Sequence, residues 1–328
     1  AYSLDGGDTL VKFGDPVIQI PAWESRDPKL FWHEDSHAYI MVLWIDGNDF
    51  GIWRSKDLEH FEMTQRLTLE GGFECPDLFC LPVIGQDGEP EDSKYVFWCG
   101  DGSYFVGAFD GCRFTMEQKK KNAYLSGPHG ILNYAAQTYS GISGGRVLSV
   151  AWLRTEAICG VTKGAMAIPR ELTLQRSEEG CFLQLVFPEE IKSRLNDSEH
   201  MPENAECRFQ GNLSERAVAV HMHMRNPEPI AKDSEVHGYH TEEREWSFAF
   251  LDEQGERMLT ISCQKETKTL FWEHGIVTEI CEPGVSFDDL EMIYDRGIVE
   301  LSSADGAHYL VADFPDLRLK ACSGVKLL

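Results

Sequence analysis

AYIMVLWIDGN, residues 38–48, decides the fold class of this chain. Its β-branched and aromatic run, Ala38–Trp44, predicts a strand, and the Asp-Gly-Asn cluster that follows predicts a tight turn. The runs Tyr95–Trp98 and Val147–Trp152 repeat the pattern, whereas a helical pattern occurs only at Pro188–Leu195. Short strands at such regular spacing predict an all-β protein.

The two halves of the chain differ in composition. Up to about residue 195 the sequence is rich in Trp, Gly and acidic motifs, and its short strands indicate a sandwich, a barrel or a propeller. Beyond the polar stretch Asn196–Asn204, runs such as Ala217–Met224 and Trp246–Phe250 simply alternate in side-chain type. That alternation predicts a β-sandwich over residues 196–328.

The charge balance excludes several classes of partner. The 328 residues carry 30 Lys plus Arg against 54 Asp plus Glu, a net charge of −24. So acidic a surface repels nucleic acid and anionic membranes, and it suits a neutral ligand. No apolar run approaches the roughly 20 residues of a membrane span. The first residues, Ala1–Thr9, resemble a strand end, a Gly-rich turn and a new strand, so we expect part of the protein to precede them.

Cysteine and histidine usage predicts neither a metal nor a cofactor. The ten cysteines are scattered without a CxxC pair, which favours a reducing, cytoplasmic location over a secreted one. His221 and His223 share one face of a predicted strand, but no third metal ligand accompanies them. The sequence also lacks a nucleotide-binding glycine fingerprint.

Two acidic motifs carry candidate chemistry, Arg26–Pro28 and Phe73–Asp77. In each, a carboxylate lies at the edge of an apolar strand, beside a proline that interrupts regular pairing. Apolar neighbours favour the protonated form of Glu74, which is the form a general acid needs. Asp27, beside Arg26, is expected to stay ionised and to accept hydrogen bonds from sugar hydroxyls. Carboxylates beside aromatic residues are more often structural, so chemistry alone does not decide between the two interpretations.

The order of the motifs resembles glycoside hydrolase family 32, which comprises invertases, levanases, inulinases and fructan exohydrolases. The matching segments are Tyr2–Gly7, Arg26–Lys29, Ser55–Leu58, Glu74–Asp77, Tyr134–Thr138, Pro169–Leu174, Asp295–Glu300 and Phe314–Pro315. The resemblance spans nearly the whole chain. It implies a five-bladed β-propeller over residues 1–195 with a funnel-shaped site on its axis, followed by a β-sandwich over residues 196–328.

The resemblance also implies an activity and the residues that perform it. Members of the family cleave terminal β-fructofuranosyl linkages of sucrose, levan or inulin type with retention, so the implied partner is a fructose-containing oligo- or polysaccharide. Carried over by motif, Glu74 is the general acid/base and Asp27 the transition-state stabiliser. Arg26, Tyr134 and Trp152 are the implied substrate-binding residues.

One part of the family's machinery has no counterpart here. The family's nucleophile lies in an Asn-Asp-Pro-Asn-Gly segment, which this sequence does not contain. Asp5 and Asp8 lie in a turn that the family already has, so they do not replace it. We therefore expect the first blade to be missing or incomplete, with open strand edges that favour pairing into a homo-oligomer.

Three interpretations follow: a fragment of a normal enzyme, an enzyme whose missing carboxylate is supplied by a rearranged site or a partner chain, and a non-catalytic carbohydrate-binding relative. The motifs do not separate a hydrolase from a fructosyltransferase, because both form the same covalent intermediate. Linkage and chain-length preference are likewise not readable from the motifs.

Overall fold

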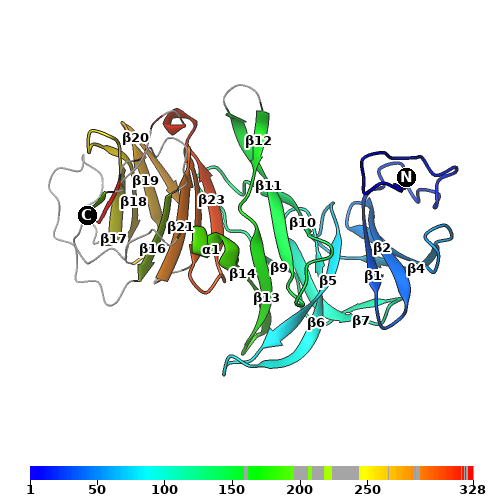
Figure 1. Ribbon diagram of the computed structural model, residues 1–328. Helices are drawn as coiled ribbons and strands as arrows, with labels where there is room; N and C mark the ends of the chain where they lie inside the picture. Colours follow the sequence, from blue (N-terminus) through cyan, green and yellow to red (C-terminus); the bar gives the residue numbers. More distant parts are fainter. Residues whose placement is uncertain are drawn as a thin grey trace. The chain divides into compact units, whose positions relative to one another are not determined.

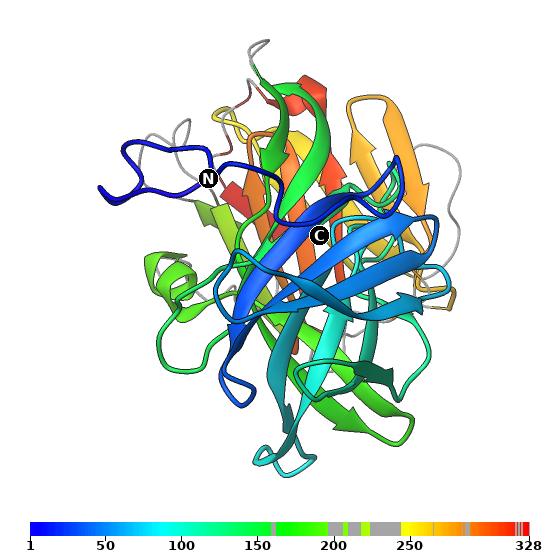
Figure 2. The same cartoon turned by 90° about the vertical axis from the view of Figure 1, so that its right-hand side faces the viewer.

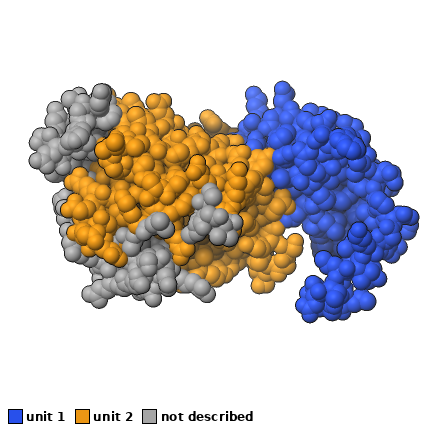
Figure 3. All heavy atoms as spheres, turned by 90° about the horizontal axis from the view of Figure 1, so that it is seen from above, with its two compact units in different colours: residues 1–80, 93–121 blue, residues 81–92, 122–328 orange. Residues whose placement is uncertain are grey.

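The computed structural model describes residues 1–158, 162–195, 206–208, 218–223, 244–264, 266–283, 285, 289–318, 320, 322 and 324–327. The chain divides into two compact units, coloured separately in Figure 3. Unit 1 comprises residues 1–80 and 93–121, and unit 2 comprises residues 81–92 and 122–328. The predicted domain boundary at residue 195 is a different division of the chain and stays a prediction.

Unit 1 contains a four-stranded antiparallel sheet whose strands follow one another in chain order (Figure 2). They are β1 (Arg26–His33), β2 (Ala38–Asp46), β3 (Asp49–Ser55) and β4 (Glu62–Thr68). The prediction from the opening stretch is confirmed, because β2 ends at Asp46 and turns at Gly47, whose φ of 54° suits glycine.

The long apolar run of β2 is explained by burial on both of its faces. Ile40 and Val42 belong to a core cluster with residues of β3, β6 (Pro90–Trp98) and β7 (Ser103–Phe109). Met41 and Leu43 pack with Trp53 in a second cluster on the other face. A strand that is buried on both faces has an unbroken apolar sequence and not an alternating one.

The remaining strands of unit 1 include a hairpin of aromatic residues. β7 (Ser103–Phe109) pairs antiparallel with β6 (Pro90–Trp98) and with β8 (Phe114–Met116). β5 (Asp77–Ile84), β6 and β9 (Lys121–Asn122) each contribute residues to both units. At the start of the chain the expected pair of strands is reduced to one bridge, in which Tyr2 and Val11 exchange two backbone hydrogen bonds of 2.9 Å.

Unit 2 begins with a second group of antiparallel strands. They are β10 (Asn133–Thr138), β11 (Leu148–Ile158), β12 (Thr162–Met166), β13 (Arg170–Ser177) and β14 (Gly180–Val186). β11 pairs with β10, β12 and β13, and β13 also pairs with β14. The predicted helical segment is confirmed as α1 (Glu189–Leu195).

The rest of unit 2 forms a sandwich of two sheets (Figure 1). The six-stranded sheet has the order β15 (Glu206–Arg208), β24 (Gly324–Leu327), β17 (Arg244–Leu251), β18 (Arg257–Gln264), β19 (Leu270–His274) and β20 (Val277–Cys281). The four-stranded sheet has the order β16 (Val218–His223), β21 (Asp289–Asp295), β22 (Ile298–Ser303) and β23 (Tyr309–Asp313), after which η2 (Pro315–Leu317) forms a 3-10 turn. Trp246, Phe248 and Phe250 alternate into one core with Met292 and Leu301, as the plain alternation of this region predicts.

A buried ion pair connects β13 with the four-stranded sheet inside unit 2. The Arg170 guanidinium donates to the Glu300 carboxylate at 3.2 Å, and the Tyr309 hydroxyl donates to the same carboxylate at 2.6 Å. The side chains of Arg170 and Glu300 are only 3% and 5% exposed.

Among the described residues, no helix has the length and apolar character needed to cross a bilayer.

Candidate functional site

The two predicted acidic motifs lie against each other in unit 1. Three contacts join them: Arg26 with Glu74, Asp27 with Cys75, and Lys29 with Asp77. Each contact links residues 48 positions apart, so the two segments run side by side in the same direction. The structure thus brings three of the five predicted site residues into one cluster.

A β-bulge positions Asp27 at the start of β1. Arg26 pairs with Trp44 and Lys29 with Val42, so two residues of β1 face the single residue Leu43 of β2. The bulge coincides with Pro28, which cannot donate a ladder hydrogen bond. Bulges commonly redirect a side chain beside a functional site, and here the redirected side chain is that of Asp27.

Arg26 binds Glu74 directly. Its Nε donates to Glu74 Oε1 at 3.1 Å, and its Nη2 makes a second, shorter bond to the same oxygen. The guanidinium also lies over the Trp44 ring, 4.1 Å from its centroid, and the pKa of Arg26 is raised above its ordinary value, chiefly by the hydrogen bond to Glu74. Arg26 is 39% exposed and Glu74 16% exposed, so the pair is accessible from solvent.

This contact corrects the expected environment of Glu74. Apolar neighbours were expected to keep its carboxyl protonated, and Arg26 was expected to serve Asp27. The structure instead gives Glu74 the arginine, while Asp27 Oδ2 lies 3.9 Å from Arg26 Nε. Glu74 thus has a cationic neighbour that its apolar sequence context did not indicate.

Asp27 is held by the loop that carries Glu74. Its Oδ2 accepts a hydrogen bond from the Cys75 backbone N at 3.3 Å and from Cys75 Sγ at 3.5 Å. Burial, followed by the charge of Asp27, raises the pKa of the Cys75 thiol to about 12. The thiol therefore stays protonated at neutral pH and serves as a donor, and the Asp27 side chain, 33% exposed, remains accessible to a ligand.

Backbone strain is concentrated at the same residues. Asp27, Glu74 and Cys75 have φ values of 62°, 51° and 40°. Residues other than glycine seldom adopt this left-handed region, and they keep it only where the surroundings hold them there. Strain of this kind clusters at functional sites, which supports a functional interpretation of the cluster.

The two predicted aromatic residues lie in unit 2. Tyr134 of β10 pairs with Trp152 of β11, and their rings meet edge to face with centroids 6.4 Å apart. The Arg154 guanidinium covers the Tyr134 ring at 4.7 Å, and Trp152 is 40% exposed. Their assignment as substrate-binding residues stays a prediction.

Lys29 and Asp77, which were not predicted as site residues, join the same two motifs. Lys29 Nζ donates to Asp77 Oδ2 at 2.9 Å, and the two side chains are 12% and 1% exposed. A signal for this contact exists in the sequence, because Arg-Asp-Pro-Lys and Glu-Cys-Pro-Asp have complementary charges at their first and fourth positions and proline at the third.

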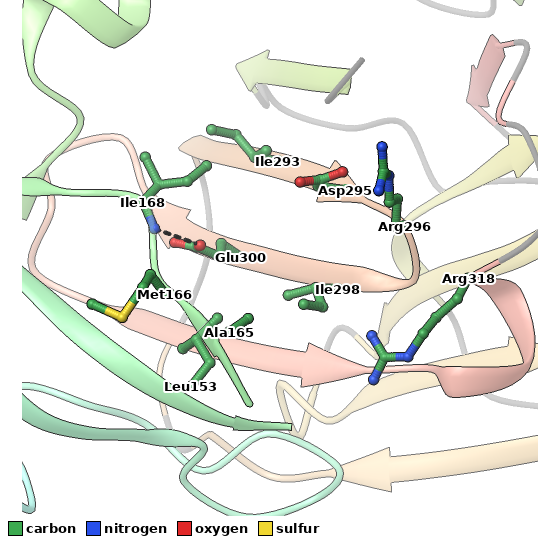
Figure 4. A pocket seen from close by; sticks show the side chains of 10 residues that line it. All are labelled: Leu153, Ala165, Met166, Ile168, Ile293, Asp295, Arg296, Ile298, Glu300 and Arg318. Atoms are coloured by element: carbon green, nitrogen blue, oxygen red, sulfur yellow. Dashed lines mark hydrogen bonds between the residues drawn. The ribbon is translucent and has the colours of Figure 1, made fainter. Parts of the chain in front are cut away.

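Unit 2 contains a pocket of about 390 Å³. Figure 4 shows it between the end of β12 and the hairpin of β21 and β22, with the hydrogen bond from Ile168 N to Glu300 at its wall. Its lining residues are Leu153, Ala165, Met166, Ile168, Ile293, Asp295, Arg296, Ile298, Glu300 and Arg318. None of the predicted site residues is among them. Within the described ranges, no group of three or more His, Cys, Asp or Glu side chains has an arrangement suited to a metal ion.

Comparison with known proteins places these features in context. Residues 1–184 match the sequence model of the glycosyl hydrolases family 32 N-terminal domain. A levanase of Bacillus subtilis (strain 168) is 37% identical over 204 residues, which cover 55% of this chain and 29% of the levanase. An invertase of Debaryomyces hansenii is 30% identical over 194 residues, covering 53% of this chain and 35% of the invertase. The matches thus span about a third of the length of these curated relatives.

Solved structures share the fold. A fructofuranosidase from Schwanniomyces occidentalis complexed with fructosylnystose matches with a TM-score of 0.69 at 19% identity, over 99% of this chain and 71% of that one. An exo-inulinase from Aspergillus awamori matches with a TM-score of 0.63 at 20% identity, over 95% of this chain and 70% of that one. The predicted fold, a propeller-type half followed by a β-sandwich, is confirmed by this likeness.

Proposed function

Because the chain belongs to the glycosyl hydrolases of family 32, we propose that its cluster of Asp27, Glu74 and Arg26 binds the terminal β-fructofuranosyl unit of a sucrose-, levan- or inulin-type saccharide and serves its retaining cleavage. The observation that carries the proposal is the direct contact between the two acidic motifs at a constant offset of 48 residues. The names of the levanase, invertase and inulinase relatives support the choice of sugar.

The roles follow from the environment of each carboxylate. Asp27 takes its hydrogen bonds from the Cys75 backbone and thiol and is partly exposed, so it can accept further hydrogen bonds from fructose hydroxyls. Such bonds strengthen as positive charge develops on the sugar ring in the transition state. Glu74 stands one residue before Cys75 and protonates the leaving oxygen.

Arg26 affects the two halves of this reaction in opposite ways. It stabilises the carboxylate of Glu74, the form that must remove a proton from water in the second step. The first step requires a protonated Glu74, so the arginine must move its donors away when the sugar enters. The guanidinium is 39% exposed and lies over the Trp44 ring.

The retaining mechanism also needs a nucleophilic carboxylate about 5 Å from the acid. This sequence contains no Asn-Asp-Pro-Asn-Gly segment, so binding and turnover are separate questions for this chain. The same cluster serves a fructosyltransferase when a sugar replaces water as the acceptor.

The test compares hydrolysis of sucrose, inulin and levan by the wild type and by Glu74→Gln, with Asp49→Asn as a matched control on an exposed ion pair of the same unit. Where the wild type turns over a substrate, we expect turnover to fall by about 100- to 10,000-fold in Glu74→Gln and to be unchanged in Asp49→Asn. Equal and detectable turnover in the wild type and Glu74→Gln would refute Glu74 as the acid, and no turnover by the wild type would refute cleavage by this chain alone.

A second candidate, a non-catalytic sugar-binding relative, is favoured by the Arg26–Glu74 pair itself. A glutamate that an arginine keeps ionised is an acceptor for sugar hydroxyls and not an acid. This candidate predicts measurable fructose or fructan affinity without turnover. Product analysis at high sucrose concentration distinguishes both candidates from a transferase, which forms longer oligosaccharides.

A further inference from the structure

The two motifs are complementary over four positions. Arg26 lies against Glu74, Asp27 against Cys75, and Lys29 against Asp77. Prolines occupy the third position of both segments. The first two contacts belong to the candidate site described above. The third contact, Lys29–Asp77, joins the fourth residues of the two motifs and lies outside that site.

The Lys29–Asp77 pair differs from the Arg26–Glu74 pair in its burial. Lys29 and Asp77 are 12% and 1% exposed, and Asp77 Oδ1 also accepts a hydrogen bond from the Leu78 backbone N at 2.8 Å. A buried ion pair costs much of its attraction in desolvation, so it is weak as a source of stability. It is demanding in geometry, however, because a charge displaced from its partner is left buried and uncompensated.

The pair also lies next to the strained backbone. Lys29 is the first residue to resume regular pairing with β2 after the bulge at Asp27, and Asp77 is the first residue of β5 after the left-handed Glu74 and Cys75. Unfavourable φ values persist only where the surroundings over-determine them. An ion pair just beyond each distorted segment supplies such a constraint to both segments at once.

We propose that the buried Lys29–Asp77 ion pair is a positioning element that fixes the distance and orientation between the Asp27 and Glu74 carboxylates. Asp77 is not placed to touch a sugar, since it is almost fully buried. The pair acts through the two segments that it joins. The proposal rests on the proposed function for its consequence in sugar binding, but not for its structural part.

The test uses the full chain with two variants and a control. Asp77→Asn removes one charge at nearly constant shape, and Lys29→Met/Asp77→Leu replaces the pair with apolar side chains that leave no buried charge. Asp49→Asn is the control, because the Asp49–Arg66 pair lies in the same unit but is 28% and 54% exposed. Fructose and sucrose affinity is measured by calorimetry, and amide hydrogen exchange by mass spectrometry of peptides that cover residues 26–29 and 74–77.

We expect Asp77→Asn to accelerate exchange in both peptides and to weaken fructose binding by at least about tenfold, because a displaced Asp27 carboxylate loses hydrogen bonds to the sugar. The double variant should unfold at a temperature close to that of the wild type. Its affinity for fructose should nevertheless be weaker than that of the wild type. That split between stability and affinity is what a merely structural pair would not produce.

Two results would overturn the proposal. Unchanged exchange in both peptides would show that the pair does not hold the two segments, whatever the protein binds. Wild-type affinity in the double variant would show that the pair serves folding alone. If the wild type itself binds neither sugar, the proposed function fails, and the exchange data still decide whether the pair holds the segments.

Discussion

Two arginine–glutamate pairs in this molecule use the same chemistry for different ends. Arg26–Glu74 in unit 1 is 39% and 16% exposed, and Glu74 has a left-handed backbone. Arg170–Glu300 in unit 2 is 3% and 5% exposed, with the Arg170 guanidinium between the rings of Phe187 and Tyr309.

The difference shows how an ion pair is adapted to structure or to ligand binding. Glu300 is fully engaged, because Ile168 N, Arg170 and the Tyr309 hydroxyl all donate to it. Its side chain is only 5% exposed, although it forms part of the wall of the pocket in unit 2. Glu74 shares its arginine with solvent and with Glu24, and its strained backbone is retained by neighbours. Partial exposure together with strain therefore distinguishes the pair that we propose to be functional from the buried pair.

The largest expected effect comes from breaking the buried pair. Arg170→Met leaves the Glu300 carboxylate buried without its counter-ion, and we expect a loss of about 3–5 kcal/mol in the free energy of unfolding. Urea denaturation measures it. The matched control, Arg66→Met, breaks the exposed pair with Asp49 and should cost less than about 1 kcal/mol. Equal losses of unfolding free energy in Arg170→Met and Arg66→Met would show that the buried pair is no more important for stability than the exposed one.

The next prediction concerns the stability contributed by the partly exposed Arg26–Glu74 pair. Glu74→Gln removes the charge of a partly exposed pair, so we expect its free energy of unfolding to change by less than about 1 kcal/mol. Urea denaturation under the same conditions measures this change in the free energy of unfolding. A loss as large as that of Arg170→Met would mean that Glu74 is a structural residue.

A chemical probe tests the contact between Asp27 and Cys75. Because burial and the Asp27 charge raise the pKa of Cys75 to about 12, its thiolate is scarce at pH 8 and alkylation should be slow, rising with pH. Asp27→Asn removes one of these causes and should accelerate alkylation by up to about tenfold, the value of one pKa unit. Mass spectrometry of the Cys75 peptide follows the reaction. An unchanged alkylation rate in Asp27→Asn would contradict the contact between Asp27 and Cys75. Asp49→Asn is the control and should react like the wild type.

The smallest effect concerns a surface pair, in which the side chains of His60 and Asp57 are 85% and 50% exposed. The hydrogen bond that His60 Nδ1 makes to the Asp57 carboxylate raises the pKa of His60 above its ordinary value of 6.5. The stability that this contact contributes is present below pH 6.5 and is lost as the pH rises through the raised pKa. His60→Gln should thus lower the urea midpoint slightly at pH 5 and leave it unchanged at pH 9. A larger effect at pH 9 would contradict this sign.

The sequence predicted the local elements well and the contacts between them poorly. β2 and α1 were predictable because their signals, an apolar run before a turn and a Glu-rich helical start, lie within a few residues. The grouping of Asp27 with Glu74 came from the order of motifs. That Arg26 binds Glu74 in preference to Asp27 was not predictable, because adjacency in sequence favoured Asp27 and only the fold brings residue 74 close.

Residues that act at long range left still weaker signals. Arg170 and Glu300 are 130 positions apart, and nothing near either residue indicates its partner. Lys29 and Asp77 differ in this respect, because the complementary order of Arg-Asp-Pro-Lys and Glu-Cys-Pro-Asp was visible in the sequence. Charge complementarity between separated motifs is a signal that alternation and propensity do not capture.

Calorimetric titration of fructose and sucrose into the wild type and Asp27→Asn tests the central claim most directly. We expect measurable binding to the wild type and affinity weaker by about 10- to 100-fold in Asp27→Asn, since a hydrogen bond to a charged group contributes about 1.5–3 kcal/mol. Asp49→Asn should bind like the wild type. Equal affinity in the wild type and Asp27→Asn, or no binding to the wild type, would contradict the claim that this strained, partly exposed cluster holds a fructosyl unit.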